Sequence, residues 1–263
     1  MIAVCLIRDR PEYRREAFVR GLAHTGHKVV ASGSPSSKED LFVIWNRYGG
    51  NEVEANRWER LGGTVVVCEN GYIGKDERDR QLYAISVHGH NGSGWWPTGD
   101  TDRFGALGID VKPWRTEGEY ILVCGQRGIG SALMASPVLW HEKAATRIQK
   151  IDSHPIKLRL HPGRHEAVVP LNTDLSKAHA VAIWSSSSGV KALVEGIPVV
   201  YDAPRWIASD SGVPLSDIGK LCRDDEKRKT ALHKMAWAQW TVDEILRGEP
   251  FARIKERLGS ASW

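Results

Sequence analysis

Two different rhythms of apolar and polar residues alternate along the first part of the chain. Short apolar runs, rich in Val and Ile, are separated by longer stretches in which apolar residues recur every three or four positions. The first rhythm is typical of buried strands and the second of amphipathic helices. The expected strands are 2–7, 27–31, 42–45 and 64–68, and the expected helices are 12–25 and 51–61.

The same alternation starts again after residue 115, and the tail from 224 to 258 has a helical pattern that is broken near 248–250. Strands separated by helices predict parallel, doubly wound sheets. We therefore expect an α/β protein with two Rossmann-like domains facing a cleft: residues 1–115, residues 116–223, and C-terminal helices in 224–263. The second set of expected elements comprises strands 119–124, 156–160, 180–184 and 197–201, and helices 139–150 and 189–195.

Residues 69–115 differ from their surroundings, because Gly and Pro occur there at short intervals. A long loop-rich segment inside a compact protein is usually functional or disordered, and the aromatic residues of this one argue against disorder. The chain has 11 Trp against 6 Tyr and 4 Phe. Indoles in polar segments either stack on sugars and bases or plug irregular loops onto a core, and the sequence leaves both interpretations open.

Composition excludes several classes of protein. The apolar runs are all too short for a membrane helix, and residues 1–7 lack the basic start of a signal peptide. We therefore expect a soluble, cytoplasmic protein without membrane contact. The four widely spaced cysteines predict reduced, buried thiols instead of a disulfide scaffold. The formal net charge of +4 is compatible with a polyanionic partner but does not require one.

Phosphate-binding chemistry is indicated by residues 157–165 and 180–200. Each piece is an apolar strand that ends in polar groups, and four serines at 185–188 open the helix that follows. Hydroxyls and free N–H groups at the positive end of a helix bind anions, although a single serine there would be only an N-cap. Charge-assisted contacts from His161 and Arg164 would add to this site. The expected donor-binding residues are His161, Arg164, Ser186, Ser187, Ser188 and Lys191, with Gln126 and Arg127 approaching from strand 119–124.

These residues also carry a resemblance. His161-Pro162, the stretch 174–178, the serine turn and the run 192–199 resemble the donor half of GT-B-type glycosyltransferases, particularly the capsule transferases that use CMP-Kdo or CMP-sialic acid. The whole chain also resembles glycosyltransferase-like proteins encoded by phages. The resemblance implies a GT-B-like fold in which His161 and residues 186–188 hold the phosphate of a nucleotide-sugar.

A weaker part of the resemblance is Glu69-Asn-Gly-Tyr72, which is similar to an acidic-Gly motif in the acceptor half of those enzymes. The chain departs from the family at Lys191, where Glu is frequent, and at Asn70, where an acidic residue is frequent. The first departure leaves the nucleotide open. The second makes Glu69 the better acid/base candidate.

Glu69 follows the expected strand 64–68, so its carboxylate would project from a strand end and take the proton of an acceptor hydroxyl. A structural role, in which Glu69 accepts N–H bonds in a turn, is the alternative. Asp100 and Asp102 are the other candidates for the catalytic carboxylate.

Asp100-Thr-Asp102 also resembles a divalent-cation motif, but it lies in a loop, and the serine and His/Arg cluster offers charge neutralisation without metal. We expect no metal and no resident cofactor, with a divalent metal as the less favoured option. The glycines of 125–130 match the dinucleotide fingerprint poorly, which argues against a dehydrogenase.

The expected function is therefore the transfer of a sugar from a nucleotide-sugar to the hydroxyl of a 5-hydroxymethyl pyrimidine in DNA, in the host cytoplasm if the protein is phage-encoded. Trp95 or Trp96 would replace the stacking of a base that is turned out of the duplex. The alternatives are a glycosyltransferase for a cell-surface or capsule glycan, and a non-catalytic nucleotide- or DNA-binding module. The expected acceptor-binding residues are His88, His90, Asn91, Trp95, Trp96, Arg103, Lys112, Trp114 and Arg115.

Overall fold

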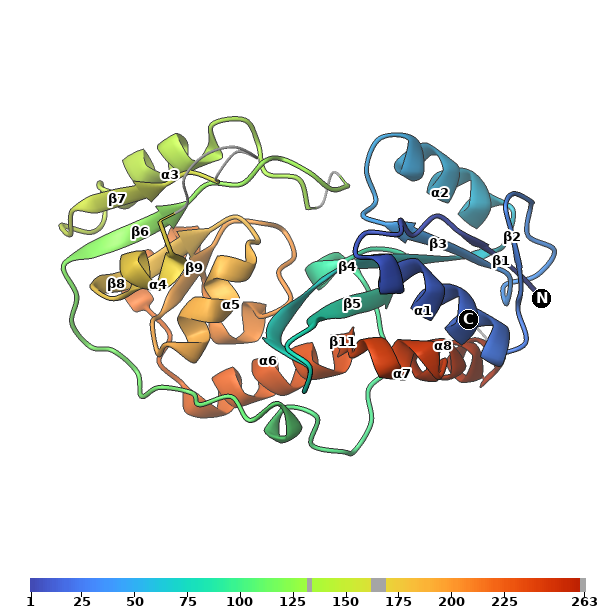
Figure 1. The fold of residues 1–263 in the computed structure, drawn as a ribbon. Helices are drawn as coiled ribbons and strands as arrows, with labels where there is room; N and C mark the ends of the chain where they lie inside the picture. Colours follow the sequence, from blue (N-terminus) through green and yellow to red (C-terminus); the bar gives the residue numbers. More distant parts are fainter. Residues whose placement is uncertain (132–133, 162–168, 261–263) are drawn as a thin grey trace. The chain divides into compact units, whose positions relative to one another are not determined.

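The computed structural model describes residues 1–131, 134–161 and 169–260, and the chain divides into two compact units (Figure 1). Unit 1 comprises Met1–Leu107 together with Lys234–Trp263, and unit 2 comprises Gly108–His233. The sequence-based boundaries after 115 and 223 both fall inside unit 2. One reason is that the segment from Gly108 onward is already hydrogen-bonded to unit 2, with the Lys112 N–H donating to the Val194 carbonyl at 2.8 Å.

Unit 1 contains a six-stranded mixed sheet with the order β11-β5-β4-β3-β1-β2. Strands β1 to β4 pair in parallel, whereas β5 is antiparallel to β4 and β11 is antiparallel to β5. The prediction of a parallel sheet is therefore confirmed for four strands and wrong for the edge formed by β5 and β11. The strands are β1 (Ile2–Cys5), β2 (Lys28–Val30), β3 (Leu41–Trp45), β4 (Thr64–Lys75), β5 (Gln81–Val87) and β11 (Gln239–Trp240).

The prediction of a loop directly after residue 68 is also wrong. Strand β4 does not end at Cys68 but runs on to Lys75, and β5 follows it, so the first part of the segment 69–115 is a β-hairpin. A register shift between Asn70 and Lys75 disturbs the alternation of apolar and polar residues there. Because this alternation is the sequence signal for a strand, the pattern hides the second half of β4.

Four helices pack on this sheet: α1 (Glu12–His24), α2 (Gly50–Arg60), α7 (Val242–Leu246) and α8 (Glu249–Ser260). Helices α1, α7 and α8 contact one another, while α2 packs on β3 and β4 (Figure 1). A Cβ at Gly21 would lie only 1.9 Å from the Ile245 carbonyl oxygen, so only glycine allows α1 to approach α7 this closely. The core beneath α2 is formed by Val4, Phe42, Ile44, Ala55, Trp58, Val65 and Val67.

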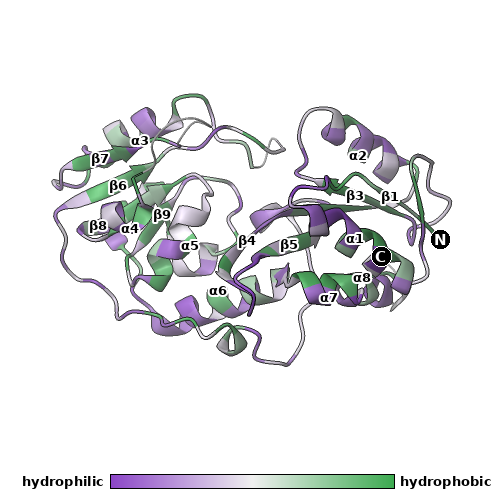
Figure 2. Cartoon of the chain, viewed as in Figure 1, coloured by the Kyte–Doolittle hydropathy of each residue, from purple (hydrophilic) through white to green (hydrophobic). Residues whose placement is uncertain are grey.

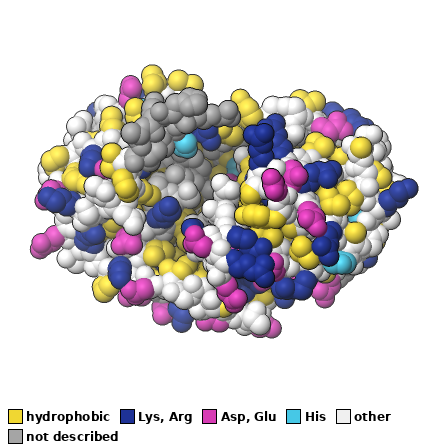
Figure 3. All heavy atoms as spheres, in the orientation of Figure 1, with side chains coloured by type: hydrophobic (Ala, Val, Ile, Leu, Met, Phe, Trp, Pro, Cys, Tyr) yellow, Lys and Arg dark blue, Asp and Glu magenta, His cyan; other side chains and the backbone are white. Residues whose placement is uncertain are grey.

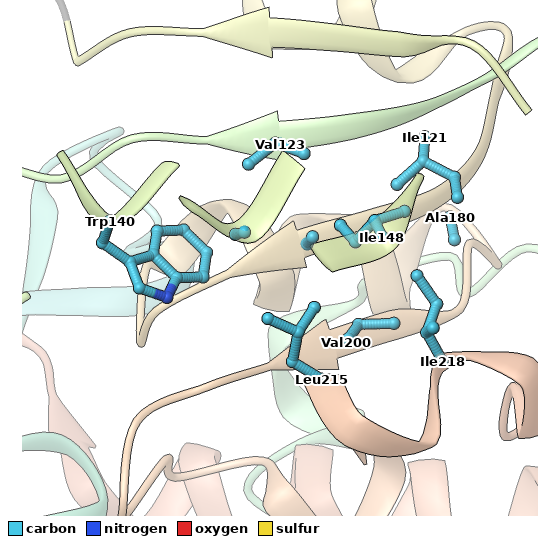
Figure 4. Packing of buried hydrophobic residues seen from close by; sticks show 10 residues of the cluster. Ile121, Val123, Trp140, Ile148, Ala180, Val200, Leu215 and Ile218 are labelled. Atoms are coloured by element: carbon cyan, nitrogen blue, oxygen red, sulfur yellow. The ribbon is translucent and has the colours of Figure 1, made fainter. Parts of the chain in front are cut away.

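Unit 2 contains a five-stranded parallel sheet with the order β10-β9-β8-β6-β7. The alternating pattern predicts four of these strands but not the short edge strand β10. Strands β6, β8 and β9 are mainly apolar (Figure 2), and Figure 4 shows the core that they form with α3. The strands are β6 (Tyr120–Cys124), β7 (Ile156–Arg159), β8 (Ala178–Ile183), β9 (Val199–Tyr201) and β10 (Val213–Pro214), and the helices are α3 (Trp140–Ile148), α4 (Leu171–Leu175) and α5 (Ser187–Val194), followed by α6 (Asp225–Ala238), which ends in unit 1.

The irregular parts of the chain contain short 3₁₀ turns: η1 (Asn91–Ser93), η2 (Gly105–Leu107), η3 (Ser209–Ser211) and η4 (Leu215–Lys220). All four cysteines are free thiols, and Cys5, Cys68 and Cys124 are buried, which confirms the expectation of reduced thiols for these three. Burial raises the pKa of the Cys68 thiol well above its ordinary value. No helix among the described residues is both long and apolar enough to span a membrane.

One buried side chain connects the C-terminal segment to β4. The Gln239 carboxamide, which is 1% exposed, accepts the N–H groups of Tyr72 and Ile73 at 2.8 and 3.2 Å. It also donates to the Ile73 carbonyl at 2.6 Å. These three bonds satisfy backbone groups at the irregular part of β4, which would otherwise be buried without partners. We call this arrangement the Gln239 clamp.

We predict that Gln239→Met destabilises unit 1, because Met keeps the length of the side chain but leaves two N–H groups and one carbonyl unsatisfied. The expected loss is about 2–4 kcal/mol of unfolding free energy. Urea unfolding measures it, with the exposed Gln149→Met at the end of α3 as the control, for which we expect a change below ~0.5 kcal/mol. Equal unfolding midpoints for the two variants would contradict the clamp.

Candidate functional site

A cavity of about 130 Å³ lies in unit 2, where β6 and β7 end and α5 begins. Five of the expected donor-binding residues line it: His161, Ser186, Ser187, Ser188 and Lys191. The expected contact Arg164 lies outside the described residues. Sequence reasoning missed the remaining lining residues, which are Cys124, Gly125, Arg159, Leu160 and Leu171.

The serines of the turn at 185–188 make different contacts. Ser186 is the N-cap of α5, because its Oγ accepts the Ser188 N–H at 3.2 Å and lies 2.9 Å from the Ser188 Oγ. The N-cap interpretation is therefore correct for Ser186. Ser187 is exposed, and its hydroxyl has no hydrogen bond within the described part of the chain. This hydroxyl is available to a ligand in the cavity.

Gln126 contacts the serine turn at Ser185. Its Oε1 accepts the Ser185 N–H at 2.6 Å, and its Nε2 lies 3.4 Å from the Ser185 Oγ. Gln126 does not line the cavity, so the structure gives it a positioning geometry in place of the expected donor contact. Arg127 is exposed and does not line the cavity either.

The positive charge of the cavity comes from Arg159 and Lys191. The Arg159 guanidinium pairs with Asp174 and donates to the Val169 carbonyl at 2.8 Å, which holds it at the cavity wall. Asp174 is 6% exposed, and burial raises the pKa of its carboxyl, but Lys157 and Arg159 outweigh this and lower that pKa overall. The Lys191 ammonium is exposed and has no ion pair among the described residues.

Arg159 was missed because its importance depends on Asp174, which is distant in sequence. Lys157 and Arg159 alternate with apolar residues along β7, and this pattern alone indicates cations on the solvent-facing side of a strand. Two cations at spacing i, i+2 beside a buried acid are visible only after α4 has placed Asp174 against β7.

Cys124 lines the cavity but is not a nucleophile at neutral pH. Burial raises the pKa of its thiol to about 11, although a hydrogen bond with Ser188 opposes this shift. The thiol therefore stays protonated. With a protonated thiol, three serines, His161 and two cations, the cavity is suited to bind an anion.

Glu69 lies in unit 1 within β4, not at a strand end, so that premise of the sequence interpretation is wrong. It pairs with Ala84 of β5, and its half-buried carboxylate accepts the Tyr72 hydroxyl at 2.6 Å. The alternative, in which Glu69 accepts backbone N–H groups in a turn, is not observed either, because the group that donates to Glu69 is the Tyr72 hydroxyl. Sequence reasoning did not single out Tyr72 as a functional residue.

The other two acidic candidates lie in the loop after β5. Asp102 accepts the Gly105 N–H at 2.8 Å and so caps the short turn η2, while Asp100 is exposed. No group of three or more His, Cys, Asp or Glu side chains among the described residues is placed to hold a metal ion.

The residues expected to bind DNA are divided between the two units: Lys112, Trp114 and Arg115 belong to unit 2 and the others to unit 1. The Arg115 guanidinium donates to the carbonyls of Leu175 and Ala178, and Lys112 pairs with Asp110. Trp114 is covered by the Arg228 guanidinium, 4.1 Å from the ring centre. The side chains of Trp114 and Arg115 therefore stabilise unit 2 internally, whereas the pair of Lys112 and Asp110 is exposed.

In unit 1 the expected acceptor residues are also engaged. Trp96 is 7% exposed and donates to the Lys234 carbonyl at 3.2 Å, and Trp95 pairs with Val87 as a short extension of the sheet. Arg103 forms an ion pair with Glu244 at 2.6 Å and lies over Trp240. For Trp96 the loop-plugging interpretation is the correct one, whereas Trp95 is half-buried and lines a cavity of about 630 Å³ with His88 and Glu59.

The remaining three residues lie around the end of β5. His88 pairs with Glu59 at 2.9 Å, and this bond, with those from Arg47, lowers the pKa of Glu59 to about 2 although burial opposes the shift. His90 and Asn91 are buried. Figure 3 shows Lys and Arg side chains beside Asp and Glu side chains in many places on each unit.

Comparison with known proteins gives the fold. No protein-family model and no curated protein sequence matches the chain. Among solved structures, it is similar to the β-Kdo 2,7 transferase of Thermosulfurimonas dismutans KpsC, with a TM-score of 0.58, 13% identity, and coverage of 93% of this chain and 97% of the other. The β-Kdo 2,4 transferase of the same KpsC gives a TM-score of 0.54 at 16% identity, covering 90% of each chain. The fold is that of these transferases. The predicted GT-B-like α/β class is thereby confirmed.

We predict that His161→Ala lowers the affinity of unit 2 for nucleoside phosphates about 10–100-fold, as expected for the loss of a hydrogen bond to a charged group. Isothermal titration calorimetry with CMP, UDP and GDP measures the change. Lys143→Ala removes an exposed cation of α3 outside the cavity and serves as the control. Unchanged affinity of His161→Ala for all three nucleotides would remove His161 from the site.

Proposed function

We propose that the protein is a glycosyltransferase that takes a sugar from a nucleotide-sugar bound in the cavity of unit 2. The observation that carries the proposal is the cavity itself, in which His161, the serine turn and two cations surround the start of α5. A nucleotide-sugar has a phosphate next to the bond that breaks, so its leaving group gains negative charge during transfer. Fixed positive groups at that position stabilise the transition state more than the ground state.

The roles within the cavity follow from the contacts. Arg159 is held by Asp174 and provides a charge of fixed position, whereas Lys191 is exposed and can follow the donor as it binds. The Ser187 hydroxyl and the free N–H groups at the start of α5 would complete the phosphate contacts. Gln126 keeps the serine turn in place through Ser185.

We further propose that Glu69 is the general base in unit 1. An acceptor hydroxyl oxygen attacks the anomeric carbon of the donor, the bond from this carbon to the phosphate oxygen breaks, and the hydroxyl proton passes to the Glu69 carboxylate. Glu69 is half-buried and has one oxygen held by Tyr72, which leaves the other oxygen for the proton. Asp102 is the weaker candidate because it caps η2.

A glycan acceptor is favoured over DNA. Both similar structures are named for the transfer of Kdo in a defined linkage, which supports a sugar hydroxyl as the acceptor. Among the residues on which the DNA interpretation depended, the side chains of Trp96, Arg103 and Arg115 are each used inside their own unit. We therefore propose transfer to a cell-surface or capsule glycan.

Glu69→Gln tests the base. The amide keeps the shape of the side chain but does not accept a proton, so turnover should fall about 10²–10⁴-fold while donor affinity stays unchanged. Glu77→Gln, an exposed carboxylate in the β4–β5 turn, is the control and should retain full activity. Activity of Glu69→Gln at the level of the control would return the role to Asp100 or Asp102.

A donor and acceptor panel tests the reaction. Nucleotide-sugars, including CMP-Kdo, are incubated with oligosaccharide fragments, 5-hydroxymethylated DNA and unmodified DNA, and mass spectrometry detects the added sugar. We expect transfer to an oligosaccharide. Transfer to hydroxymethylated DNA alone would overturn the acceptor assignment, and nucleotide binding without any transfer would indicate a non-catalytic binding module.

A further inference from the structure

Tyr72 is a buried titratable side chain in contact with the proposed base. Its side chain lies in β4, the residue is 6% exposed, and burial together with the Glu69 carboxylate raises the pKa of the phenol well above its ordinary value. The hydroxyl is therefore protonated at neutral pH. A protonated phenol donates one hydrogen bond, and Glu69 Oε1 receives it at 2.6 Å.

The direction of this bond is fixed by a second partner. The Asn91 N–H donates to the Tyr72 oxygen at 3.1 Å, so the phenol proton is directed away from Asn91 and toward Glu69. Asn91 has φ of 54° at the start of η1, a left-handed conformation that asparagine tolerates better than most residues. The backbone is thus placed at some energetic cost where its N–H meets the phenol.

The meeting of Glu69 and Tyr72 depends on the irregularity of β4. Residues three apart in a regular strand point to opposite faces of the sheet, so a Tyr72 side chain in a regular β4 would point away from Glu69. The register shift between Asn70 and Lys75 removes this alternation. The Gln239 clamp holds the Tyr72 N–H at that shift and so fixes the position of the ring.

We propose that Tyr72 is the positioning residue of the catalytic base. Its hydroxyl occupies Oε1 of Glu69, holds the carboxylate in one rotamer and leaves Oε2, which has no hydrogen bond within the described part of the chain, for the proton of the acceptor hydroxyl. The proposal rests on the proposed role of Glu69. What it adds is that Tyr72 orients the Glu69 carboxylate without itself contacting the donor or the acceptor.

A double-mutant cycle with Glu69→Gln tests the proposal. Tyr72→Phe keeps the buried ring and removes only the hydroxyl, so we expect kcat to fall roughly 10–100-fold, as for a misplaced catalytic group, with the KM for the donor within about twofold of wild type. In the Glu69→Gln background the same substitution should have no further effect on kcat, because the two residues act as one unit.

Tyr48→Phe, which removes an exposed hydroxyl of unit 1, is the control and should leave kcat unchanged. A structural role alone would lower the residual activity of Glu69→Gln as well, so multiplicative losses would overturn the proposal, as would wild-type kcat in Tyr72→Phe. If Glu69→Gln is itself fully active, the proposed base is wrong instead. Urea unfolding checks in each variant that unit 1, which carries the substitutions, is folded, and calorimetric donor binding checks unit 2.

Discussion

The hydrogen bonds of Gln239 join β4 to a segment 167 residues later in the chain. They satisfy the backbone of β4 at the one place where its register shifts, and the shift brings Tyr72 to the Glu69 side of the strand. An unsatisfied N–H in this buried position would favour a regular strand or a frayed one. The geometry around Glu69 therefore depends on the C-terminal segment, which belongs to unit 1.

The charged groups at the cavity of unit 2 are partly balanced by one another. Asp174 neutralises part of the charge of Arg159 and Lys157, which allows Arg159 to remain at the wall of the cavity. Lys191 adds its charge from an exposed position, where hydration compensates it. The serine turn adds polar groups without net charge. The proposed phosphate site thus combines the exposed Lys191 with Arg159, whose charge has an anionic partner.

Tryptophan and arginine are used inside this protein where composition indicated an external partner. Arg103 lies between Glu244 and the rings of Trp237 and Trp240, and Arg228 covers Trp114. A guanidinium over an indole face is a favourable contact that does not need a ligand. An excess of these residues in irregular segments is therefore equally consistent with a loop held to the core, and only the contacts distinguish the two.

The sequence by itself determined the elements whose signal is local: the parallel strands of both sheets, the N-cap at Ser186, and the group formed by His161, the serine turn and Lys191. Parallel βαβ units place strand ends together by topology, so these residues meet without further information. The tertiary structure alone decided the antiparallel edge of β4 and β5, the charge pair of Arg159 and Asp174, and the contact of Tyr72 with Glu69. Each of these depends on a register shift or on a partner distant in the chain, and neither leaves a periodic pattern in the sequence.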